Sequence, residues 1–332
     1  MVYIYKKPVG DRTYYYLRAS ERKNGKIVIK DIAYLGSSLE EIKQSLEKLS
    51  QHSEKIRKAY KTIRNFLESN RYLQKAKESK LKKDEWLGGK TLEIEACKIH
   101  YNYEFQKHPL LTKQEVYKNF IIEFAYNTAS IEGNTIKLDE ARKLLDEGLT
   151  PKNKTLREVY DLQNTEKVFL SLLEKRQEFN HQFIIDVHKR LVENIDARIG
   201  YRTSDVRVIR ANFKATPAPY VKTDMDLLLK WYGQHKKTLH PLTLATIFHH
   251  KFEKIHPFMD GNGRTGRMLF DAILINNNYP PVIVHKKKRD KYLQALRTAD
   301  PSDPSKANKE HYQKLIDFMA EEMTETYWNI FL

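Results

Sequence analysis

The sequence is poor in the features that secreted and membrane proteins rely on. Cys97 is the only cysteine among 332 residues, so an intrachain disulfide is excluded and a reducing compartment is expected. No apolar run approaches the roughly 18–20 residues that a membrane-spanning helix needs. The N-terminus also lacks the apolar core of a signal peptide. We therefore expect a soluble, cytoplasmic protein with no membrane partner.

Acidic residues are scarce relative to basic ones. The chain has 43 aspartates and glutamates against 59 lysines and arginines, which gives a formal net charge of +16. The excess is uneven, because residues 1–90 hold 22 basic and only 11 acidic residues. Such a basic segment is typical of contact with a polyanion, and nucleic acid is therefore a candidate partner for residues 1–90.

The first 36 residues carry strand and turn signals. Aromatic residues at 14–16 and β-branched residues at 26–35 predict strands, and Asn24-Gly25 predicts the tight turn between them. Ser38 and Glu41 form a capping-box pattern that predicts the start of a helix. Apolar residues at helical spacing then continue to about residue 80.

After Pro109 the chain is helical and richer in apolar faces, apart from a β-like stretch between Gly200 and Tyr220. We therefore expect a mainly α protein, an all-helical core with one small β-hairpin inserted. The predicted domains are a β module over 1–36, a basic helical arm over 37–108, a helical core over 109–312 and a C-terminal helix over 313–332.

The strongest local signal is the run His-Pro-Phe-Met-Asp-Gly-Asn-Gly-Arg-Thr-Gly-Arg over residues 256–267. Pro257 and Gly261 stop one apolar helix, and a second begins directly afterwards. The backbone N–H groups of Gly261, Asn262 and Gly263 would face outward at the start of the second helix, where a nest and the helix dipole bind phosphate.

Four side chains in the run suit phosphate chemistry. Arg264 and Arg267 are three residues apart, so they share a helical face and could clamp a polyphosphate. Asp260 is a hard oxygen ligand for Mg²⁺ beside the phosphates. His256 titrates near neutral pH and could take a hydroxyl proton. Each feature alone is common in purely structural contexts, but together they indicate phosphoryl or nucleotidyl transfer.

The same run resembles the signature of the Fic family, H-x-F-x-(D/E)-G-N-G-R-x-x-R, with every defined position filled. Gly200 and Arg202, His250 and the segment 278–281 also fit, so the resemblance covers roughly residues 110–310. Most members of the family transfer AMP from ATP to a Ser, Thr or Tyr hydroxyl of a target protein. The resemblance therefore implies a protein adenylyltransferase that uses ATP and Mg²⁺.

The resemblance also implies a role for each residue of the site. The implied roles are proton acceptor for His256, Mg²⁺ ligand for Asp260, phosphate cradle for Gly261, Asn262 and Gly263, β-phosphate contact for Arg264, γ-phosphate contact for Arg267, and adenine contact for Tyr292. Phe258 is expected to be a core anchor, and Asp300 stands where the family often has a nucleoside-side Asn.

A second implied element is the flap, the hairpin whose backbone pairs with an extended segment of the target protein. It is expected at residues Val206, Arg207, Val208, Ile209 and Arg210. Because backbone pairing reads little sequence, the chain does not reveal which protein is the target.

Residues 128–134 resemble the inhibitory segment of the family, (S/T)-x-x-x-E-(G/N). The resemblance implies that Glu132 ends an inhibitory helix and pairs with Arg267, in the place that the γ-phosphate needs. A glutamate before glycine is also a common plain helix end.

Alternatives remain at this stage. Glu132 could act as the base for a water that removes AMP from a modified protein, or the chain could be a nucleic-acid-binding regulator that acts through residues 1–90. The basic run 285–289 could contact phosphate or be a solvated surface, and His249 and His250 are expected to be packing residues. The amphipathic C-terminal segment could pack on the core or form a homodimer.

Overall fold

The computed structural model describes residues 2–23, 25–49, 53–79, 81, 84–206, 214–302 and 307–332. The chain forms two compact units, Met1–Leu81 and Lys82–Phe331. The boundary between them lies inside the segment 37–108, and the domain limits expected from the sequence remain predictions.

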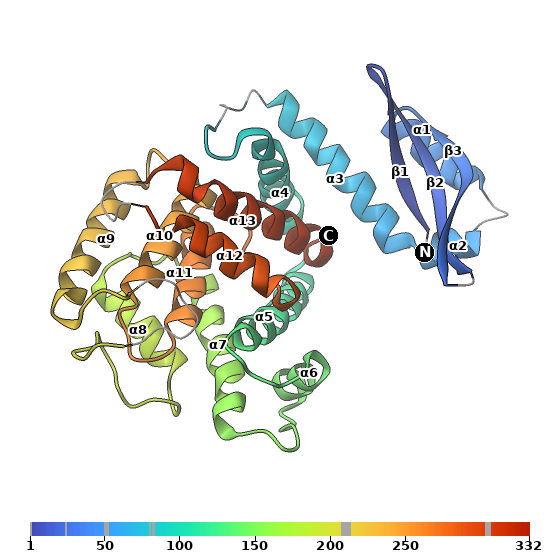
Figure 1. Ribbon diagram of the computed structural model, residues 1–332. Coiled ribbons are helices and arrows are strands. Elements are labelled where there is room, and N and C mark those ends of the chain that lie inside the picture. Colours follow the sequence, from blue (N-terminus) through green and yellow to red (C-terminus); the bar gives the residue numbers. More distant parts are fainter. Residues whose placement is uncertain are drawn as a thin grey trace. The chain divides into compact units, whose positions relative to one another are not determined.

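The N-terminal unit is a three-stranded antiparallel sheet followed by three helices (Figure 1). Its elements are β1 (Val2–Val9), β2 (Arg12–Lys23), β3 (Lys26–Gly36), α1 (Leu39–Lys48), α2 (Ser53–Lys58) and α3 (Tyr60–Glu78). Gly10 and Gly25 have φ of 56° and 78° at the two turns, where a left-handed backbone favours glycine. The predicted strands and the helix start at Ser38, whose side chain accepts from Glu41 N, are confirmed.

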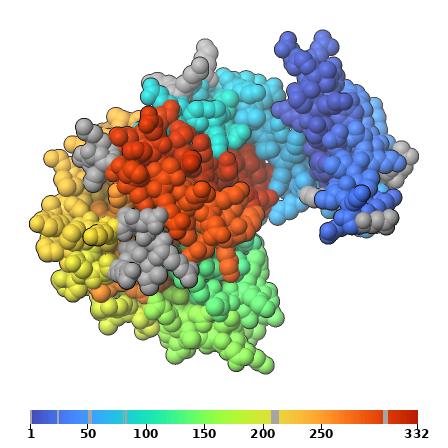
Figure 2. Space-filling model, viewed as in Figure 1, coloured from blue at the N-terminus to red at the C-terminus, as the bar shows by residue number. Residues whose placement is uncertain are grey.

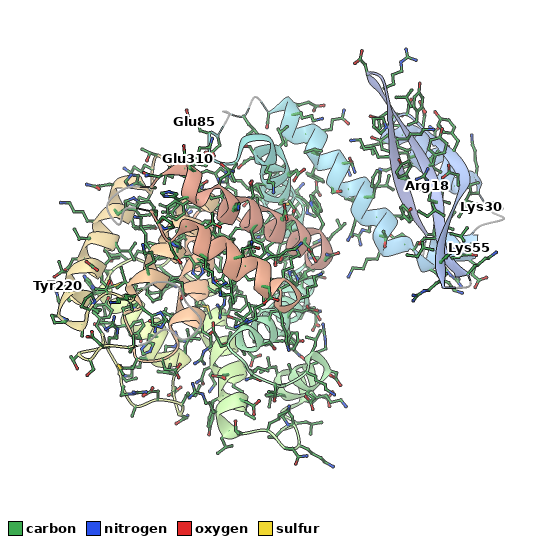
Figure 3. The ribbon with its side chains drawn as sticks, viewed as in Figure 1. Arg18, Lys30, Lys55, Glu85, Tyr220 and Glu310 are labelled. Carbon is green, nitrogen blue, oxygen red and sulfur yellow. The ribbon has the colours of Figure 1, made fainter. Side chains whose placement is uncertain are left out.

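One face of this sheet is apolar and is covered by the helices. Ile4 and Leu17 pack with Ile42 of α1 and Ile63 of α3 in a single buried cluster. The strand β3 lies at the edge of the sheet, and its first six residues are exposed. Cationic side chains such as Arg18, Lys30 and Lys55 are labelled in Figure 3.

The second unit is helical. Its helices are α4 (Thr91–Tyr103), α5 (Leu110–Ile131), α6 (Leu138–Glu147), α7 (Leu156–Glu174), α8 (His181–Leu191), α9 (Val221–His235), α10 (Pro241–Ile255), α11 (Asn262–Asn276), α12 (Arg289–Ala299) and α13 (Lys309–Ile330). Short 3₁₀ turns lie at Gly88–Lys90, Phe105–Lys107, Ala218–Tyr220 and Lys286–Lys288 (η5).

The helices α10 and α11 form the centre of this unit and are almost entirely buried. Helices α9 and α13 pack on α10, whereas α5, α7 and α8 pack on α11. Figure 2 shows α12 and α13 across one face of the unit. Leu269, Phe248 and Phe252 belong to its largest apolar cluster. Packing from all sides fixes the two helices that carry the motif, and so fixes the loop between them.

The amphipathic C-terminal segment packs within its own unit. Ile316, Met319 and Tyr327 of α13 are fully buried, and Phe331 lies in an aromatic cluster with Phe105 and Phe120. None of the helices in the described ranges combines the length and apolar content that crossing a bilayer requires.

Candidate functional site

The motif loop connects α10 to α11 through two left-handed residues. His256 ends α10 with φ of 51°, and its N–H donates to Phe252 O at 2.9 Å. Gly261 begins α11 with φ of 74°, and a Cβ built on it would lie 2.9 Å from Val192 Cγ1. A left-handed backbone at a residue other than glycine is uncommon and is concentrated at functional sites. Position 261 therefore requires glycine, and His256 has a backbone conformation that few residues other than glycine adopt.

The loop is braced from inside by Asn262 and Phe258. Asn262 Oδ1 accepts from Phe258 N at 2.9 Å, and its Nδ2 donates to Phe258 O at 2.8 Å. The Phe258 ring is fully buried and stacks on His188, with ring centroids 3.7 Å apart. His188 Nε2 in turn donates to Asp260 O at 3.1 Å. The side-chain amide of Asn262 is therefore committed to the loop, which leaves its backbone N–H for a ligand.

The ring of His256 is oriented by the helix that it ends. Its Nδ1 lies 3.3 Å from Glu253 O, and because a carbonyl oxygen can only accept, Nδ1 carries the proton. The lone pair then lies on Nε2. Burial lowers the pKa of His256 below its usual 6.5, so the ring is neutral at neutral pH. This is the tautomer and charge that a proton acceptor needs.

Asp260 lies beside the start of α11 with both carboxylate oxygens engaged. Oδ1 accepts from Gly261 N at 2.7 Å, and Oδ2 forms an ion pair with Arg157 of α7. The Asp260 carboxylate is partly exposed and lies next to an anion-binding helix end. Such a carboxylate is the hard oxygen ligand that Mg²⁺ takes in phosphate sites. Asp260 therefore fits the metal that the sequence implies.

Arg264 is fixed by a carboxylate of α7. Its guanidinium forms a buried ion pair with Asp161, whose Oδ2 also accepts from Asn134 Nδ2 at 3.3 Å. Burial raises the pKa of Asp161, and Arg264 opposes that shift. The pair joins α7 to α11 and holds the guanidinium at the edge of the pocket.

Arg267 contacts the end of α5. Its Nη2 lies 2.7 Å from Glu132 Oε1 and 3.0 Å from Thr128 O, and its Nε donates to Thr128 Oγ1 at 2.7 Å. A Cβ built on Gly263 would overlap Glu132 Oε1. The carboxylate of Glu132 therefore lies directly over the first turn of α11, where backbone N–H groups and the helix dipole favour an anion.

A further carboxyl lies next to this ion pair. Glu253 is on α10, and a Cβ built on Gly266 would overlap its Oε1. That oxygen is buried without a hydrogen-bond partner among the described residues. Burial raises the pKa of Glu253 to about 8, Arg267 lowers it and Glu132 raises it. Because Glu253 is largely protonated at neutral pH, Glu132 supplies the negative charge that Arg267 meets.

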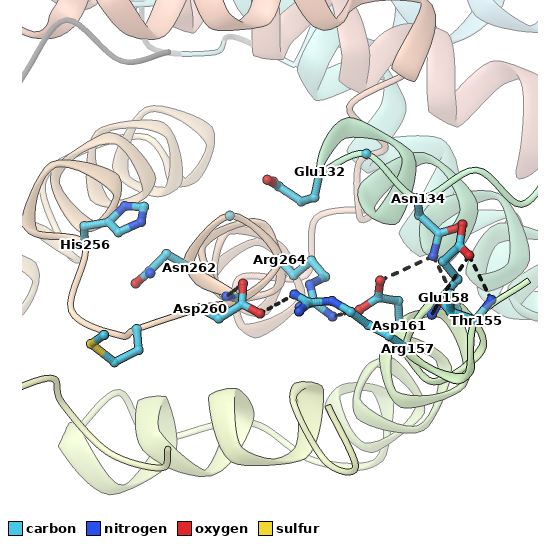
Figure 4. Close-up of a pocket in the computed structure, with 14 residues that line it drawn as sticks. Glu132, Asn134, Thr155, Arg157, Glu158, Asp161, His256, Asp260, Asn262 and Arg264 are labelled. Carbon is cyan, nitrogen blue, oxygen red and sulfur yellow. Dashed lines mark hydrogen bonds and ion pairs between the residues drawn. The ribbon is translucent and has the colours of Figure 1, made fainter. Parts of the chain in front are cut away.

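These groups surround a pocket of about 500 Å³ (Figure 4). Most of the residues expected from the sequence line it: Glu132, His256, Asp260, Gly261, Asn262, Gly263 and Arg264. The remaining lining residues come from α7, from its N-terminal cap or from beside the expected residues: Gly133, Asn134, Thr155, Arg157, Glu158, Asp161 and Met259. Arg267 lies behind Glu132 and is not among the lining residues.

Tyr292 and the flap differ from the other expected residues. Tyr292 is 1% exposed, and its hydroxyl is hydrogen-bonded to His249 Nε2. His250 bonds to Tyr312 OH and to Asp300, so both histidines are packing residues, as expected. Of the expected flap, Val206 is half-buried, whereas Arg207, Val208, Ile209 and Arg210 lie outside the described residues.

Arg202 anchors both sides of the flap segment. It is buried and donates from Nη1 to Ser204 O at 3.1 Å and from Nη2 to Thr216 O. Its Nε also donates to His256 O at 2.8 Å. Arg202 thus anchors both the flap segment, which is expected to receive the target, and His256, which is expected to take the target's proton.

Asp161 and Arg157 were missed by sequence reasoning because they lie about a hundred residues before the motif. One signal was present for Asp161. It shares the buried face of α7 with Thr165, Val168 and Leu172, and a buried carboxylate on such a face requires a partner. Arg157 is exposed and carries no comparable signal.

Comparison with known proteins agrees with this geometry. Residues 178–274 match the Fic/DOC family. The chain is 32% identical over 201 residues to the protein adenylyltransferase Fic of Drosophila ananassae, covering 58% of this chain and 38% of that protein. It is 32% identical over 186 residues to the protein adenylyltransferase fic-1 of Caenorhabditis elegans, covering 54% and 37% respectively. The chain thus spans about two-fifths of the length of these relatives.

Solved structures show the same fold. A Fic-domain signaling protein of Bacteroides thetaiotaomicron has a TM-score of 0.65 at 22% identity, over 70% of this chain and 94% of that one. Fic-1 of Caenorhabditis elegans has a TM-score of 0.61 at 22% identity, over 78% and 70%. The mainly α fold expected from the sequence is confirmed. The segment that matches the Fic/DOC family, residues 178–274, lies within the helical unit.

Proposed function

We propose that this protein transfers AMP from ATP to a hydroxyl group of a target protein. One observation carries the proposal: a neutral histidine with a free Nε2 and the anion-binding start of α11 line the same pocket. The curated relatives are named protein adenylyltransferases, which supports the same activity.

The triphosphate is assigned to the start of α11. The N–H groups of Gly261, Asn262 and Gly263 receive it, with Arg264 on the β-phosphate and Arg267 on the γ-phosphate. Asp260 would hold Mg²⁺, which when bound neutralises phosphate charge. Tyr292 is assigned to the adenine end of the site, where it would form part of the wall behind the base.

The chemical step is a displacement at the α-phosphorus. His256 Nε2 takes the proton of the target hydroxyl while its oxygen bonds to that phosphorus. The bond to the bridging oxygen of the β-phosphate breaks, and pyrophosphate leaves. Arg264 and the N–H groups of α11 stabilise the charge that develops on the phosphate oxygens. The target is assigned to the flap, where backbone pairing would align its hydroxyl with His256.

Glu132 is proposed to inhibit this reaction in the resting protein. Its carboxylate bonds to Arg267 at 2.7 Å and covers Gly263, so it competes with the γ-phosphate for the same cation and the same helix end. ATP bound against Glu132 would be displaced from the alignment with His256 that transfer requires.

The test is automodification with ATP labelled on the α-phosphate, in the presence of Mg²⁺. We expect Glu132→Gly to incorporate the label at least tenfold faster than the wild type, because Arg267 and the start of α11 become free. Adding His256→Ala to Glu132→Gly should abolish incorporation while the thermal unfolding curve stays unchanged. Equal labelling of wild type and Glu132→Gly would refute inhibition, and labelling without His256 would refute its role.

Removal of AMP from a modified protein is a second candidate, favoured by one observation. Glu132 and His256 line the same pocket, and the side chain of Glu132 is 45% exposed. A carboxylate so placed could activate a water against a phosphodiester. The test uses a target that the Glu132→Gly variant has first modified. Release of AMP from this target by the wild type, but not by Glu132→Gly, would establish the activity.

A further inference from the structure

The basic run 285–289, here called the basic strap, is partly exposed, but its residues are paired with groups of two helices. On one side it is tied to α13. His285 Nδ1 lies 2.9 Å from Glu322 Oε2, Lys288 pairs with both Glu322 and Glu325, and Lys287 pairs with Glu325. Glu322 is fully buried, and the ammonium of Lys288 offsets its charge.

The charges within this cluster are firmly paired. Burial opposes ionisation of Glu325, yet Lys287 and Lys288 lower its pKa to about 2. His285, Glu322 and Glu325 have the composition of a metal site. The ammonium of Lys288 contacts both carboxylates, however, so the cluster already has its cation. The cluster therefore attaches the basic strap to α13.

On its other side the strap holds the last turn of α5. Lys286 N donates to Asn127 Oδ1 at 2.8 Å, and Arg289 Nε donates to Ile131 O at 2.9 Å. Ile131 directly precedes Glu132, and its carbonyl is one of those that a helix leaves without an internal partner at its C-terminus. A cation at this end also complements the helix dipole.

These contacts form one continuous path. Glu322 and Glu325 of α13 fix the strap, and the strap fixes Asn127 and Ile131. The end of α5 to which these two residues belong presents Thr128 and Glu132 to Arg267. A glutamate with a half-exposed side chain keeps its position over α11 only if the backbone beneath it is fixed.

We propose that Arg289 is a positioning residue for inhibition: it caps the inhibitory turn of α5 and so holds Glu132 on Arg267. The inference rests on the proposed function, because it concerns control of the same site. Loss of the cap loosens the turn, lowers the time that Glu132 spends on Arg267, and frees the anion site for the γ-phosphate.

The experiment measures automodification by the full chain with α-labelled ATP, in the wild-type and Glu132→Gly backgrounds. In the wild-type background, Arg289→Ala should raise the rate about threefold to tenfold, the effect of one charge-assisted hydrogen bond. In the Glu132→Gly background it should change nothing, because the residue through which it acts is gone. A merely structural role would lower both rates.

Two further variants serve as controls. Lys291→Ala removes one positive charge from an exposed position on the same helix and should leave the rate unchanged. Arg289→Lys keeps a donor of the same charge and should stay close to the wild type. If Arg289→Ala folds poorly, Asn127→Ala removes the second bond to the strap and should give the same pattern.

Amide hydrogen exchange provides a second readout. In Arg289→Ala, residues 128–134 should exchange faster, whereas the rest of α5 should be unchanged. The inference is overturned if Glu132→Gly is active but Arg289→Ala and Asn127→Ala leave the wild-type rate unchanged. It is equally overturned if they alter both backgrounds alike. If Glu132→Gly is itself inactive, the proposed function fails, and this inference fails with it.

Discussion

At His256 the backbone and the ring have separate tasks. The left-handed backbone turns the chain out of α10 toward the buried Phe258, while the Nδ1 contact with Glu253 O fixes the ring. Glu253 contributes its carbonyl to this arrangement and a carboxyl with a buried oxygen to the neighbourhood of Arg267. A single residue of α10 thus orients the base and places a protonated carboxyl beside the phosphate site.

The lowered pKa of His256 predicts how transfer depends on pH. Only the neutral ring accepts a proton, and burial shifts its pKa below 6.5, so the ring stays neutral to lower pH than an exposed histidine would. The kcat/KM of the Glu132→Gly variant should therefore decline on acidification with a midpoint below pH 6.5. A midpoint above 6.5 would contradict the assigned environment of the ring.

Which site residues could be predicted follows from how they are arranged along the chain. Residues 256–267 are contiguous, so the sequence shows their spacing and therefore their common helix end. Glu132 was predicted only because its segment resembles a known inhibitory pattern. Arg157 and Asp161 come from α7, and only packing of α7 against α11 brings them to the pocket.

At the scale of elements, the site depends on ion pairs that join helices. Asp161 of α7 holds Arg264 of α11, and Glu132 at the end of α5 holds Arg267 one turn later. Arg264 and Arg267 lie on the same face of α11, but Arg264 pairs with α7 and Arg267 pairs with α5. Each pair places a guanidinium that the triphosphate would need.

Removal of Asp161 tests the first of these pairs. Asp161→Ala leaves the buried guanidinium of Arg264 without its counter-charge and should lower the free energy of unfolding by about 3 kcal/mol. It should also raise the KM for ATP in the Glu132→Gly background, since Arg264 loses its orientation. Urea denaturation and steady-state labelling check the two effects.

A control for this substitution lies at the end of the same helix. Glu174→Ala removes a negative charge from an exposed position of α7 and should change neither quantity appreciably. An Asp161→Ala protein that unfolds at the wild-type urea concentration and keeps the same KM would show that the pair does not position Arg264.

Most elements could be predicted from local patterns, because turns and helix ends depend on neighbouring residues. Gly10 and Gly25 marked the two turns of the sheet, and Pro241 marked the start of α10. The role of residues 285–289 could not be predicted, because their partners lie on α5 and α13. The sequence of a basic run does not show whether its side chains contact solvent, nucleic acid or carboxylates of the same protein.

At the scale of the whole molecule, the net charge and the proposed chemistry belong to different units. The sheet and its helices carry most of the excess charge, and β3 presents Lys26 and Lys30 at an exposed edge. The pocket lies in the helical unit, where several cations are paired internally. Nucleic-acid binding through residues 1–90, and a homodimer, remain predictions.

Salt dependence tests the nucleic-acid alternative. If the N-terminal unit binds a duplex, the logarithm of affinity should fall linearly with the logarithm of salt, by about 0.9 for each phosphate contacted. Charge reversal at Lys26 and Lys30 should weaken binding and reduce that slope. The same reversal at the exposed Lys236 and Lys237 of the helical unit is the control. Equal effects of the two reversals would exclude a specific role of the N-terminal unit.

The most direct test of the central claim is mass spectrometry of the full chain after incubation with ATP and Mg²⁺. Three proteins are compared: wild type, Glu132→Gly, and Glu132→Gly with His256→Ala. The proposed function predicts that Glu132→Gly gains the mass of AMP on a hydroxyl side chain, that the wild type gains far less, and that the double variant gains none. An unmodified Glu132→Gly protein, or the mass of a bare phosphate in place of AMP, would contradict it.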